Sequence, residues 1–198
     1  TLFQTRHKCR DDDDLEPAAY NRQGEALSFT TRPQRVLFDL LCRNMLVVPT
    51  TARDFDAFSR VTLPFNGPAI LNFGGIVLTE DGRPDAAWLA RMREQLAPLA
   101  DEMQALLVAA NAFIDEHQLK AFCRQVRDFD TDFYLVAKYR EGQAESLQQL
   151  EQQVVRPWLA SRQGRFRLHI NGNNLAVLPT VLDKAHAVQY LTERLRAE

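Results

Sequence analysis

The sequence predicts an α/β layer that is interrupted by an α+β domain, and three observations support this prediction. A helical pattern is followed at once by the short apolar run Met45 to Val48, which is typical of a strand buried on both faces of a parallel sheet. Strand pairs and helices then alternate from about residue 80 to residue 178, and another helical pattern ends the chain. We therefore expect an α/β core built from residues 1–79 and 179–198, a parallel sheet with helices on both faces. An α+β domain at residues 80–178 should be inserted into it.

The composition is that of a globular protein. The 198 residues are 45% hydrophobic and 25% charged, which excludes collagen, coiled-coil and disordered classes. A formal net charge of -2 gives no electrostatic reason to expect nucleic acid or an anionic membrane as the main partner. Cys9, Cys42 and Cys123 are far apart and predict neither a disulfide framework nor a zinc site. Because no apolar run approaches the ~18 residues of a membrane span and no basic leader is visible, we expect a soluble, cytoplasmic chain.

The two ends of the chain are less regular than the middle. Residues up to Thr30 are polar and predict irregular structure. The run Asp11 to Asp14 is interpreted as a solvated loop because adjacent carboxylates repel one another, and a cation held among them is the alternative. At the other end, a helical pattern runs to Glu198 without a cap, a glycine or a proline. The missing stop signal favours a fragment, and a native start with its methionine removed stays open.

Hydrophobic spacing predicts the first elements. Pro33 suits the first turn of a helix that ends near Asn44, and its apolar residues share one face: Val36, Leu37, Leu40 and Leu41. Two short strands should follow at 69–72 and 76–78, joined by a glycine pair.

The inserted domain has stronger signals. From Asp85 the spacing becomes helical, with a break or kink at Pro98, and the apolar stripe is interpreted as core packing. Two strands, 122–126 and 133–138, are separated by a polar turn. After one more helix, apolar and polar residues alternate strictly from Arg165 to Ile170, and Asn171-Gly172 leads to the apolar run 175–178. This predicts a hairpin with one face buried and one exposed to solvent.

One stretch combines a strand end with hydroxyl side chains. Residues 47–54 read Val-Val-Pro-Thr-Thr-Ala-Arg-Asp, so Thr51 follows the apolar run and a helix begins at Asp54. Anions bind at the carboxyl ends of parallel strands and at the free N–H groups of a helix start. A phosphate site at Thr51 is one interpretation. The other, given equal weight, is that Thr50, Thr51 and Asp54 only cap the next helix.

A second stretch, residues 178–185, places Lys184 in the first turn of a helix. A cation is unfavourable there because the positive end of the helix dipole lies at the N-terminus, and a nearby anion would compensate. The alternative is a surface lysine in an imperfect helix start.

Four segments stand in a recognisable order along the chain. They are Thr-Leu-Phe (1–3), Val-Val-Pro-Thr-Thr-Ala-Arg (47–53), Ala-Ile-Leu-Asn-Phe-Gly-Gly (69–75) and Leu-Ala-Val-Leu-Pro-Thr-Val-Leu-Asp-Lys (175–184). Together they resemble the haloacid dehalogenase (HAD) superfamily, and more narrowly its sugar-phosphatase and sucrose-phosphate-phosphatase-like branch. The resemblance implies a Rossmann-like core, an inserted α+β cap of the C2 type, and a Mg²⁺-dependent phosphatase. Its substrate would be a small phosphomonoester such as a sugar phosphate.

The resemblance also implies roles for individual residues. Thr51 would donate a hydrogen bond to the transferring phosphoryl group, although Ala52 replaces the glycine that commonly follows it in the family. Lys184 would neutralise the phosphate and the aspartate nucleophile. Thr1 would end the first motif, Asp-x-Asp-x-Thr, and Arg53 would brace the loop.

The acidic residues of the family are missing from these 198 residues. The two aspartates of the first motif would precede residue 1, and the acidic pair of the fourth motif would follow residue 198. Mg²⁺ needs carboxylate oxygens and an aspartyl-phosphate mechanism needs its aspartate, so no metal ligand is assigned here and we expect the chain as given to be inactive. Candidate substrate contacts are Thr50, Arg53, Arg124 and Lys138, and for the last two a solvated strand face is the alternative.

Other patterns receive simpler interpretations. The pairs Asp54/Asp56 and Asp128/Asp130 contain Asp-x-Asp but are interpreted as helix capping and a polar turn. His7 and Cys9 lack the second pair of ligands that a tetrahedral metal site needs. The second hypothesis for function is a catalytically inactive relative that binds a phosphorylated ligand or a protein partner. The oligomeric state is left open.

Overall fold

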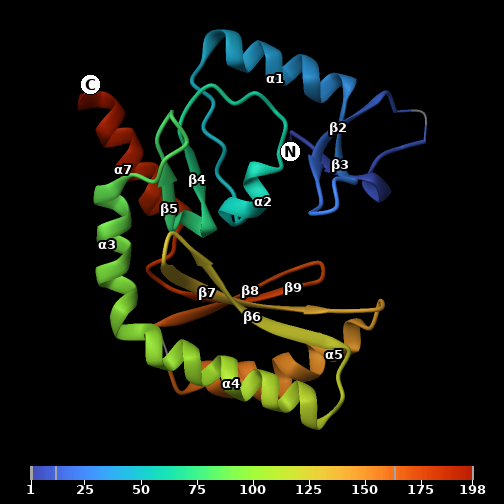
Figure 1. Ribbon diagram of the computed structural model, residues 1–198, viewed down its shortest axis with the longest axis vertical. Coiled ribbons are helices and arrows are strands. Elements are labelled where there is room, and N and C mark those ends of the chain that lie inside the picture. Colours follow the sequence, from blue (N-terminus) through green and yellow to red (C-terminus); the bar gives the residue numbers. More distant parts are fainter. Residues whose placement is uncertain (1, 12, 163, 198) are drawn as a thin grey trace. The chain divides into compact units, whose positions relative to one another are not determined.

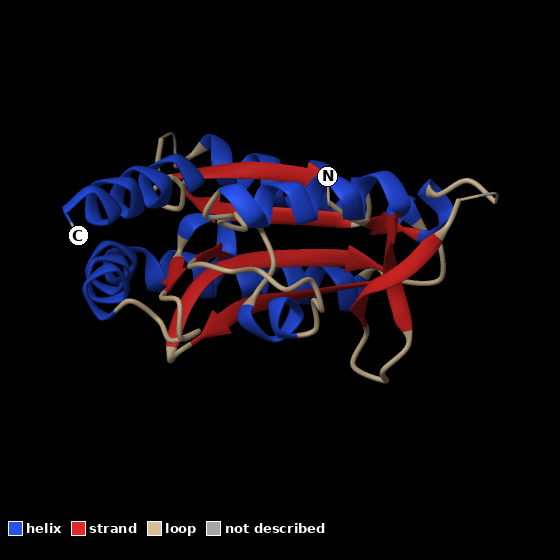
Figure 2. Cartoon of the chain, turned by 90° about the horizontal axis from the view of Figure 1, so that it is seen from above, coloured by secondary structure: helices blue, strands red, loops and turns tan. Residues whose placement is uncertain are grey.

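The computed structural model describes residues 2–11, 13–162 and 164–197, which form two compact units. Unit 1 comprises Thr1–Asp85 and Ala187–Glu198, and unit 2 comprises Ala86–His186. Helices make up 44% and strands 27% of the described residues (Figure 2). The division at residues 79 and 178 that we expect from the sequence stays a prediction.

Unit 1 opens with a three-stranded antiparallel sheet in the order β1-β3-β2 (Figure 1). Its strands are β1 (Gln4–Thr5), β2 (Leu15–Tyr20) and β3 (Ala26–Thr31), with a 3-10 turn at Arg6–Lys8. The prediction of irregular structure up to Thr30 is therefore wrong. The inward positions of these strands carry small or hydroxyl side chains, which give no apolar alternation in the sequence: Ala18, Ala19, Ser28 and Thr30.

Helix α1 (Arg32–Asn44) has the limits that the sequence predicts. The N–H of Thr31 donates to Gln34 Oε1 (2.8 Å), and Pro33 lies in the first turn, where its missing N–H costs no helical hydrogen bond. Only Phe38 of this helix is buried. Much of the apolar stripe is exposed instead, by 61% at Val36, 50% at Leu37 and 59% at Leu40.

The buried strand predicted at Met45 to Val48 is wrong. These residues have no regular structure, and Met45 and Leu46 are 61% and 43% exposed. Pairing in parallel begins only at Thr50, which bridges Ile70. The apolar run thus consists of two exposed and two partly buried side chains after α1, and Pro49 has no N–H with which to continue a ladder.

The rest of unit 1 surrounds a buried pair of strands. Strands β4 (Ala69–Leu71) and β5 (Ile76–Leu78) are antiparallel and wholly buried, which confirms the two predicted strands. The other elements are α2 (Phe55–Ser59), the 3-10 turn Asn72–Gly74 and, after unit 2, most of α7 (Lys184–Ala197).

Unit 2 is a four-stranded antiparallel sheet in the order β6-β7-β9-β8, with helices packed on it (Figure 1). The break predicted at Pro98 is confirmed, since a 3-10 turn there separates two helices. The predicted strand pair and the hairpin at residues 166–179 are confirmed as well. The expected division of the hairpin into one buried and one exposed face is wrong, since residues 175–179 are all buried and Ile170 is 49% exposed. The elements are α3 (Ala86–Leu96), the turn Ala97–Leu99, α4 (Ala100–Glu116), β6 (Ala121–Asp128), β7 (Thr131–Tyr139), α5 (Ala144–Leu150), a π-helical turn (Glu151–Val155), α6 (Arg156–Ala160), β8 (Phe166–Asn171) and β9 (Asn174–Pro179).

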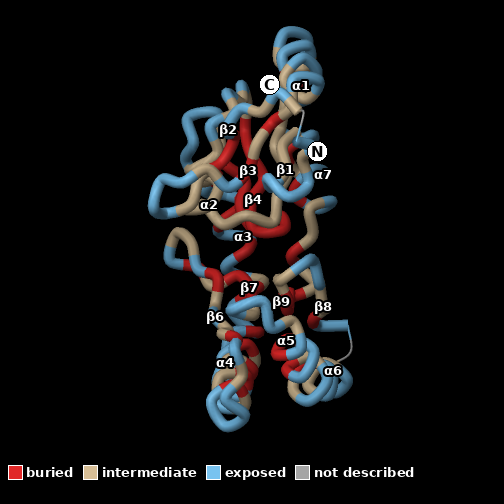
Figure 3. Tube along the Cα trace, turned by 90° about the vertical axis from the view of Figure 1, so that its right-hand side faces the viewer, coloured by how far each residue is buried: buried red, intermediate tan, exposed pale blue. Residues whose placement is uncertain are grey.

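The core of unit 2 lies between the sheet and its helices. Leu106 of α4 and Leu150 of α5 belong to one buried cluster with Leu135 of β7 and Val177 of β9. Figure 3 shows these central strands among the buried parts of the chain. No helix in the described part of the chain is both long enough and apolar enough to cross a membrane.

Candidate functional site

The loop between the parallel bridge and α2 presents the hydroxyl of Thr51. Its backbone N–H donates to the Ile70 carbonyl of β4 (2.8 Å), and its Oγ1 accepts a hydrogen bond from the N–H of Arg53 (3.1 Å). Among the residues that the structure describes, none accepts a hydrogen bond from the Thr51 hydroxyl. The side chain is therefore fixed through its acceptor role and can still donate its proton to a ligand oxygen.

The neighbouring hydroxyl and carboxylates serve the local fold. Thr50 Oγ1 donates to the Val48 carbonyl (3.4 Å). Asp54 caps α2, since its Oδ1 accepts from the Ala57 N–H (2.8 Å), so the capping interpretation of this aspartate is confirmed. Asp56 is bound by Arg60 and Arg22, and these hydrogen bonds lower the pKa of its carboxyl.

Arg53 connects this loop to α2 and to the start of the chain. Its Nη1 donates to the Ala57 carbonyl (3.4 Å), and its guanidinium carbon lies 5.3 Å from the centre of the Phe3 ring. Burial, together with the positive charge of Arg60, lowers the pKa of Arg53. The N-terminal segment therefore runs beside the Thr51 loop at Phe3, while Thr1 lies outside the described residues.

A second loop, the turn between β4 and β5, supports the first one. The N–H of Asn72 donates to the Arg53 carbonyl (3.0 Å), and the N–H of Phe73 donates to the Thr51 carbonyl (3.3 Å). Asn72 and Phe73 have φ of 50° and 56°, in the left-handed region that non-glycine residues rarely occupy. We did not expect this contact from the sequence, where the only signal is an asparagine close before a glycine pair.

The remaining candidates lie in unit 2. Lys184 is half-buried and is the first residue of α7, as the sequence predicts, and Asp183 Oδ1 accepts a hydrogen bond from the Ala185 N–H (2.9 Å). Arg124 of β6 lies opposite Val136, and Lys138 of β7 lies opposite Phe122. Because alternate strand residues point to the same side, Arg124 and Lys138 share one face of the sheet.

Unit 1 thus brings Thr50, Thr51 and Arg53 together on one loop, and unit 2 carries Lys184, Arg124 and Lys138. The meeting of these two groups in one pocket stays a prediction.

Among the described residues, the other patterns seen in the sequence form no metal site. Within residues 2–11, 13–162 and 164–197, no three histidine, cysteine or acidic side chains gather as a metal would require. These residues therefore do not provide the carboxylate set that Mg²⁺ needs. The pair Asp128/Asp130 lies at the turn between β6 and β7, where the polar-turn interpretation is confirmed.

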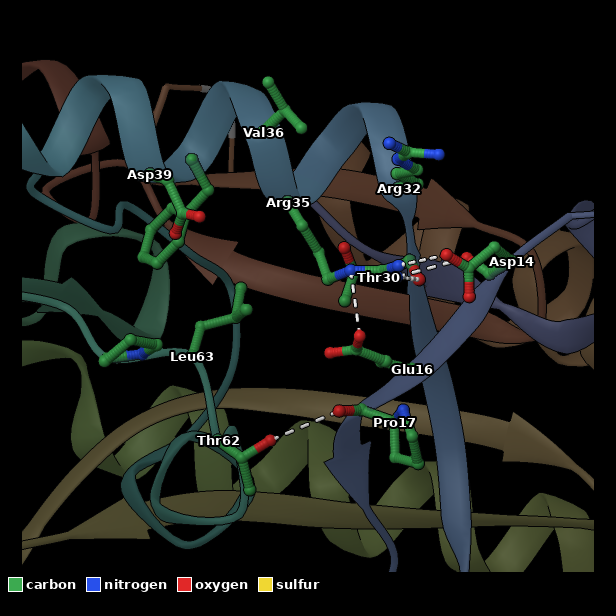
Figure 4. Close-up of a pocket in the computed structure, with 12 residues that line it drawn as sticks. Asp14, Glu16, Pro17, Thr30, Arg32, Arg35, Val36, Asp39, Thr62 and Leu63 are labelled. Carbon is green, nitrogen blue, oxygen red and sulfur yellow. Dashed lines mark hydrogen bonds and ion pairs between the residues drawn. The ribbon is translucent and has the colours of Figure 1, made fainter.

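A separate pocket of about 520 Å³ in unit 1 is lined by β2, β3, α1 and residues 62–64 (Figure 4). Arg35 lies at its centre, 20% exposed, with Nη2 2.7 Å from Asp14 and Nε 3.1 Å from Glu16. Its Nη1 donates to the backbone carbonyls of Asp14 (3.1 Å) and Thr30 (3.0 Å). Both carboxylates thus tie α1 to the sheet, and Asp14 remains 66% exposed in a loop, in agreement with the solvated-loop interpretation of the acidic run at this residue.

Comparison with known proteins gives structural matches alone. No protein-family model matches the sequence, and no curated protein is significantly similar to it. Among solved structures, the chain is similar to the sucrose-phosphatase of Synechocystis sp. PCC6803 (TM-score 0.52, 17% identity, 82% of this chain and 62% of that one). It is also similar to the C-terminal domain of trehalose-6-phosphate phosphatase of C. albicans (TM-score 0.54, 10% identity, 81% of this chain and 52% of that one). A third match is the IMP-nucleotidase of Plasmodium falciparum (TM-score 0.51, 12% identity, 82% of this chain and 55% of that one).

These matches extend over most of this chain but over only 52–62% of the three solved structures. At 10–17% identity they establish the fold. The chain shares the mixed α/β fold of these three structures, which is the fold class that the sequence predicts.

Proposed function

We propose that this chain is part of a phosphomonoester hydrolase that acts on a sugar phosphate, with residues 80–178 as a C2-type cap. The observation that carries the proposal is the Thr51 hydroxyl, which is held by backbone hydrogen bonds at the end of a parallel pairing and keeps its proton for a ligand. The fold supports it, since the similar structures are those of a sucrose-phosphatase, a trehalose-6-phosphate phosphatase and a nucleotidase.

In the proposed mechanism, an aspartate outside these 198 residues attacks phosphorus. The bond between phosphorus and the sugar oxygen breaks, and the second aspartate of the first motif, also outside these residues, would give its proton to that oxygen so that the sugar leaves as an alcohol. Water then hydrolyses the aspartyl phosphate, and the same carboxylate takes up a proton from that water. Thr51 donates a hydrogen bond to a phosphoryl oxygen, and Lys184 neutralises its charge in the transition state. Arg53 keeps the Thr51 loop in place by its contacts with α2 and Phe3.

The rest of the substrate would meet Thr50 and, on the sheet of unit 2, Arg124 and Lys138. A Mg²⁺ ion belongs to this proposal through the resemblance alone. The described residues do not form its site, so its carboxylate ligands would come from outside this sequence and no step is derived through it. The 198-residue chain by itself should release no phosphate.

The test is a steady-state assay on a polypeptide extended at both ends through the flanking reading frame, with sugar phosphates and Mg²⁺. Thr51→Ala and Lys184→Ala should each lower kcat by about 10²-fold or more, because each removes a group that acts on the transferring phosphoryl. Thr62→Ala and Lys120→Ala are matched controls at exposed or partly exposed positions and should leave kcat unchanged.

Unchanged turnover in both site variants would refute the assignment. Phosphate binding without any turnover in the extended protein would favour the inactive, ligand-binding alternative.

A further inference from the structure

Asp85 occupies a distinctive place in unit 1. It is the last residue before the chain enters unit 2, and its side chain is only 2% exposed. One carboxylate oxygen accepts a hydrogen bond from the Tyr190 hydroxyl (2.9 Å), and the other is paired with Arg194. Tyr190 and Arg194 are four residues apart on α7 and therefore lie on the same side of that helix. A single buried carboxylate thus holds α7 at two successive turns.

The backbone of Asp85 is tied to the Thr51 loop through the β4–β5 pair. Its N–H donates to the Val77 carbonyl (2.8 Å), and Val77 lies opposite Ile70 in the ladder. Ile70 in turn accepts the hydrogen bond from Thr51, and its own N–H donates to the Pro49 carbonyl (2.8 Å). A short path of backbone pairings therefore runs from Thr51 across two buried strands to Asp85.

Lys184 lies on the helix that Asp85 holds. Helix α7 begins at Lys184, six residues before Tyr190, which is about 9 Å along a helix that rises 1.5 Å per residue. Because an α-helix is stiff over two turns, a shift or rotation at Tyr190 is transmitted to Lys184.

We propose that Asp85 is a positioning residue: by holding α7 at Tyr190 and Arg194, it fixes Lys184 in the first turn of that helix. The inference rests on the proposed roles of Thr51 and Lys184. Asp85 itself touches no substrate in this proposal and acts through the helix. A purely stabilising role is the competing explanation, and it predicts that loss of the Asp85 charge affects all lysines alike and not Lys184 selectively.

The test uses the 198-residue chain and reads Lys184 directly. The rate at which an N-hydroxysuccinimide ester acylates Lys184 is measured by mass spectrometry, with Lys8 and Lys120 in the same molecule as internal standards. Hydrogen exchange of the α7 amides at residues 188–191 is followed in parallel. The variants are Asp85→Asn, which removes the charge at nearly constant shape, and Arg194→Gln, whose side chain is 44% exposed and tolerant of change.

Asp85→Asn should raise acylation of Lys184 at least about threefold and speed exchange at 188–191 by about tenfold, because the helix is released locally. Arg194→Gln should do the same to a smaller extent, and it decides the question if Asp85→Asn fails to fold. The matched control is Asp56→Asn, a carboxylate that also binds two arginines but lies on α2, and it should leave Lys184 unchanged.

Unaltered Lys184 reactivity, or an equal rise at Lys8, Lys120 and Lys184, would overturn the positioning role. A selective rise at Lys184 combined with normal turnover of Lys184→Ala would keep that role and sink the proposed function instead, so the two failures are distinguishable.

Discussion

The two units of this chain use their apolar residues differently. In unit 2, strands of six to nine residues form one sheet, and its side chains share a buried cluster with α4 and α5. In unit 1 the strands have two to six residues, and three apolar side chains of α1 are at least half exposed. Unit 2 is therefore held by core packing, whereas the Thr51 loop of unit 1 is held by backbone hydrogen bonds and by polar contacts.

The largest expected loss of stability comes from a substitution in the core of unit 2. Leu150→Ala removes a side chain that is 0% exposed and lies in the core of unit 2, so the free energy of unfolding should fall by about 2–5 kcal/mol. Urea denaturation followed by circular dichroism measures the loss.

The matched change in unit 1 is Leu40→Ala on α1, where the side chain is 59% exposed. It should alter the free energy of unfolding by no more than about 0.5 kcal/mol. Equal losses in both variants would contradict the contrast between the units.

The next effect in size tests whether polar contacts hold unit 1. The side chain of Arg35 is 20% exposed, and its guanidinium binds two carboxylates and two backbone carbonyls; Arg35→Leu removes all of these contacts. Because Asp14, Glu16 and the carbonyls then lose a charged partner, the free energy of unfolding should fall by about 1–3 kcal/mol. Thermal and urea denaturation give the value.

Arg32→Leu is the control for that change, since Arg32 lines the same pocket but is exposed. It should leave stability almost unaltered. A loss as large as that of Arg35→Leu would show that charge in the pocket, and not the contacts of Arg35, decides stability.

The same contrast explains which elements could be predicted from the sequence. In unit 2, Pro98 breaks a helix because proline lacks an N–H, and the Asn-Gly pair at 171–172 joins the two strands of a hairpin, so local rules were sufficient to place these elements. In unit 1 the inward positions of β2 and β3 carry alanine, serine and threonine, which have no apolar signature. At Met45 to Val48 the sequence predicts a strand that the structure does not contain, because composition alone does not reveal whether a neighbouring element covers an apolar segment.

The candidate site could be predicted only in its local parts. Lys184 starts a helix, as the residue spacing predicts, whereas Thr51 follows a single parallel bridge at Thr50 and not the strand predicted at Met45 to Val48. Asn72 and Phe73 form hydrogen bonds with the Thr51 loop, and Asp85 contacts Tyr190 and Arg194 of α7. The contacts of Asp85 join residues that are far apart in the sequence. Such contacts depend on the tertiary arrangement, which periodicity does not encode.

The smallest effect at neutral pH concerns Cys123, which is partly buried against the core of unit 2. Burial raises the pKa of its thiol to about 12 from an ordinary value of 9.0, so very little thiolate is present at pH 8. Cys123 should react with a thiol reagent such as dithionitrobenzoate far more slowly than Cys9 or Cys42, as single-cysteine variants would show.

The sign of the linked effect on stability follows from the same shift. Below pH 9 the thiol is neutral in both the folded and the unfolded chain, so its contribution to the free energy of unfolding is fully present. Between pH 9 and about pH 12 only the unfolded chain ionises, and this contribution is lost as the pH rises. Cys123→Ala should therefore lose less stability than the parent chain between these pH values. An identical decline in both proteins, or fast labelling of Cys123 at pH 8, would mean that this strand of unit 2 opens readily and that its packing is no tighter than that of unit 1.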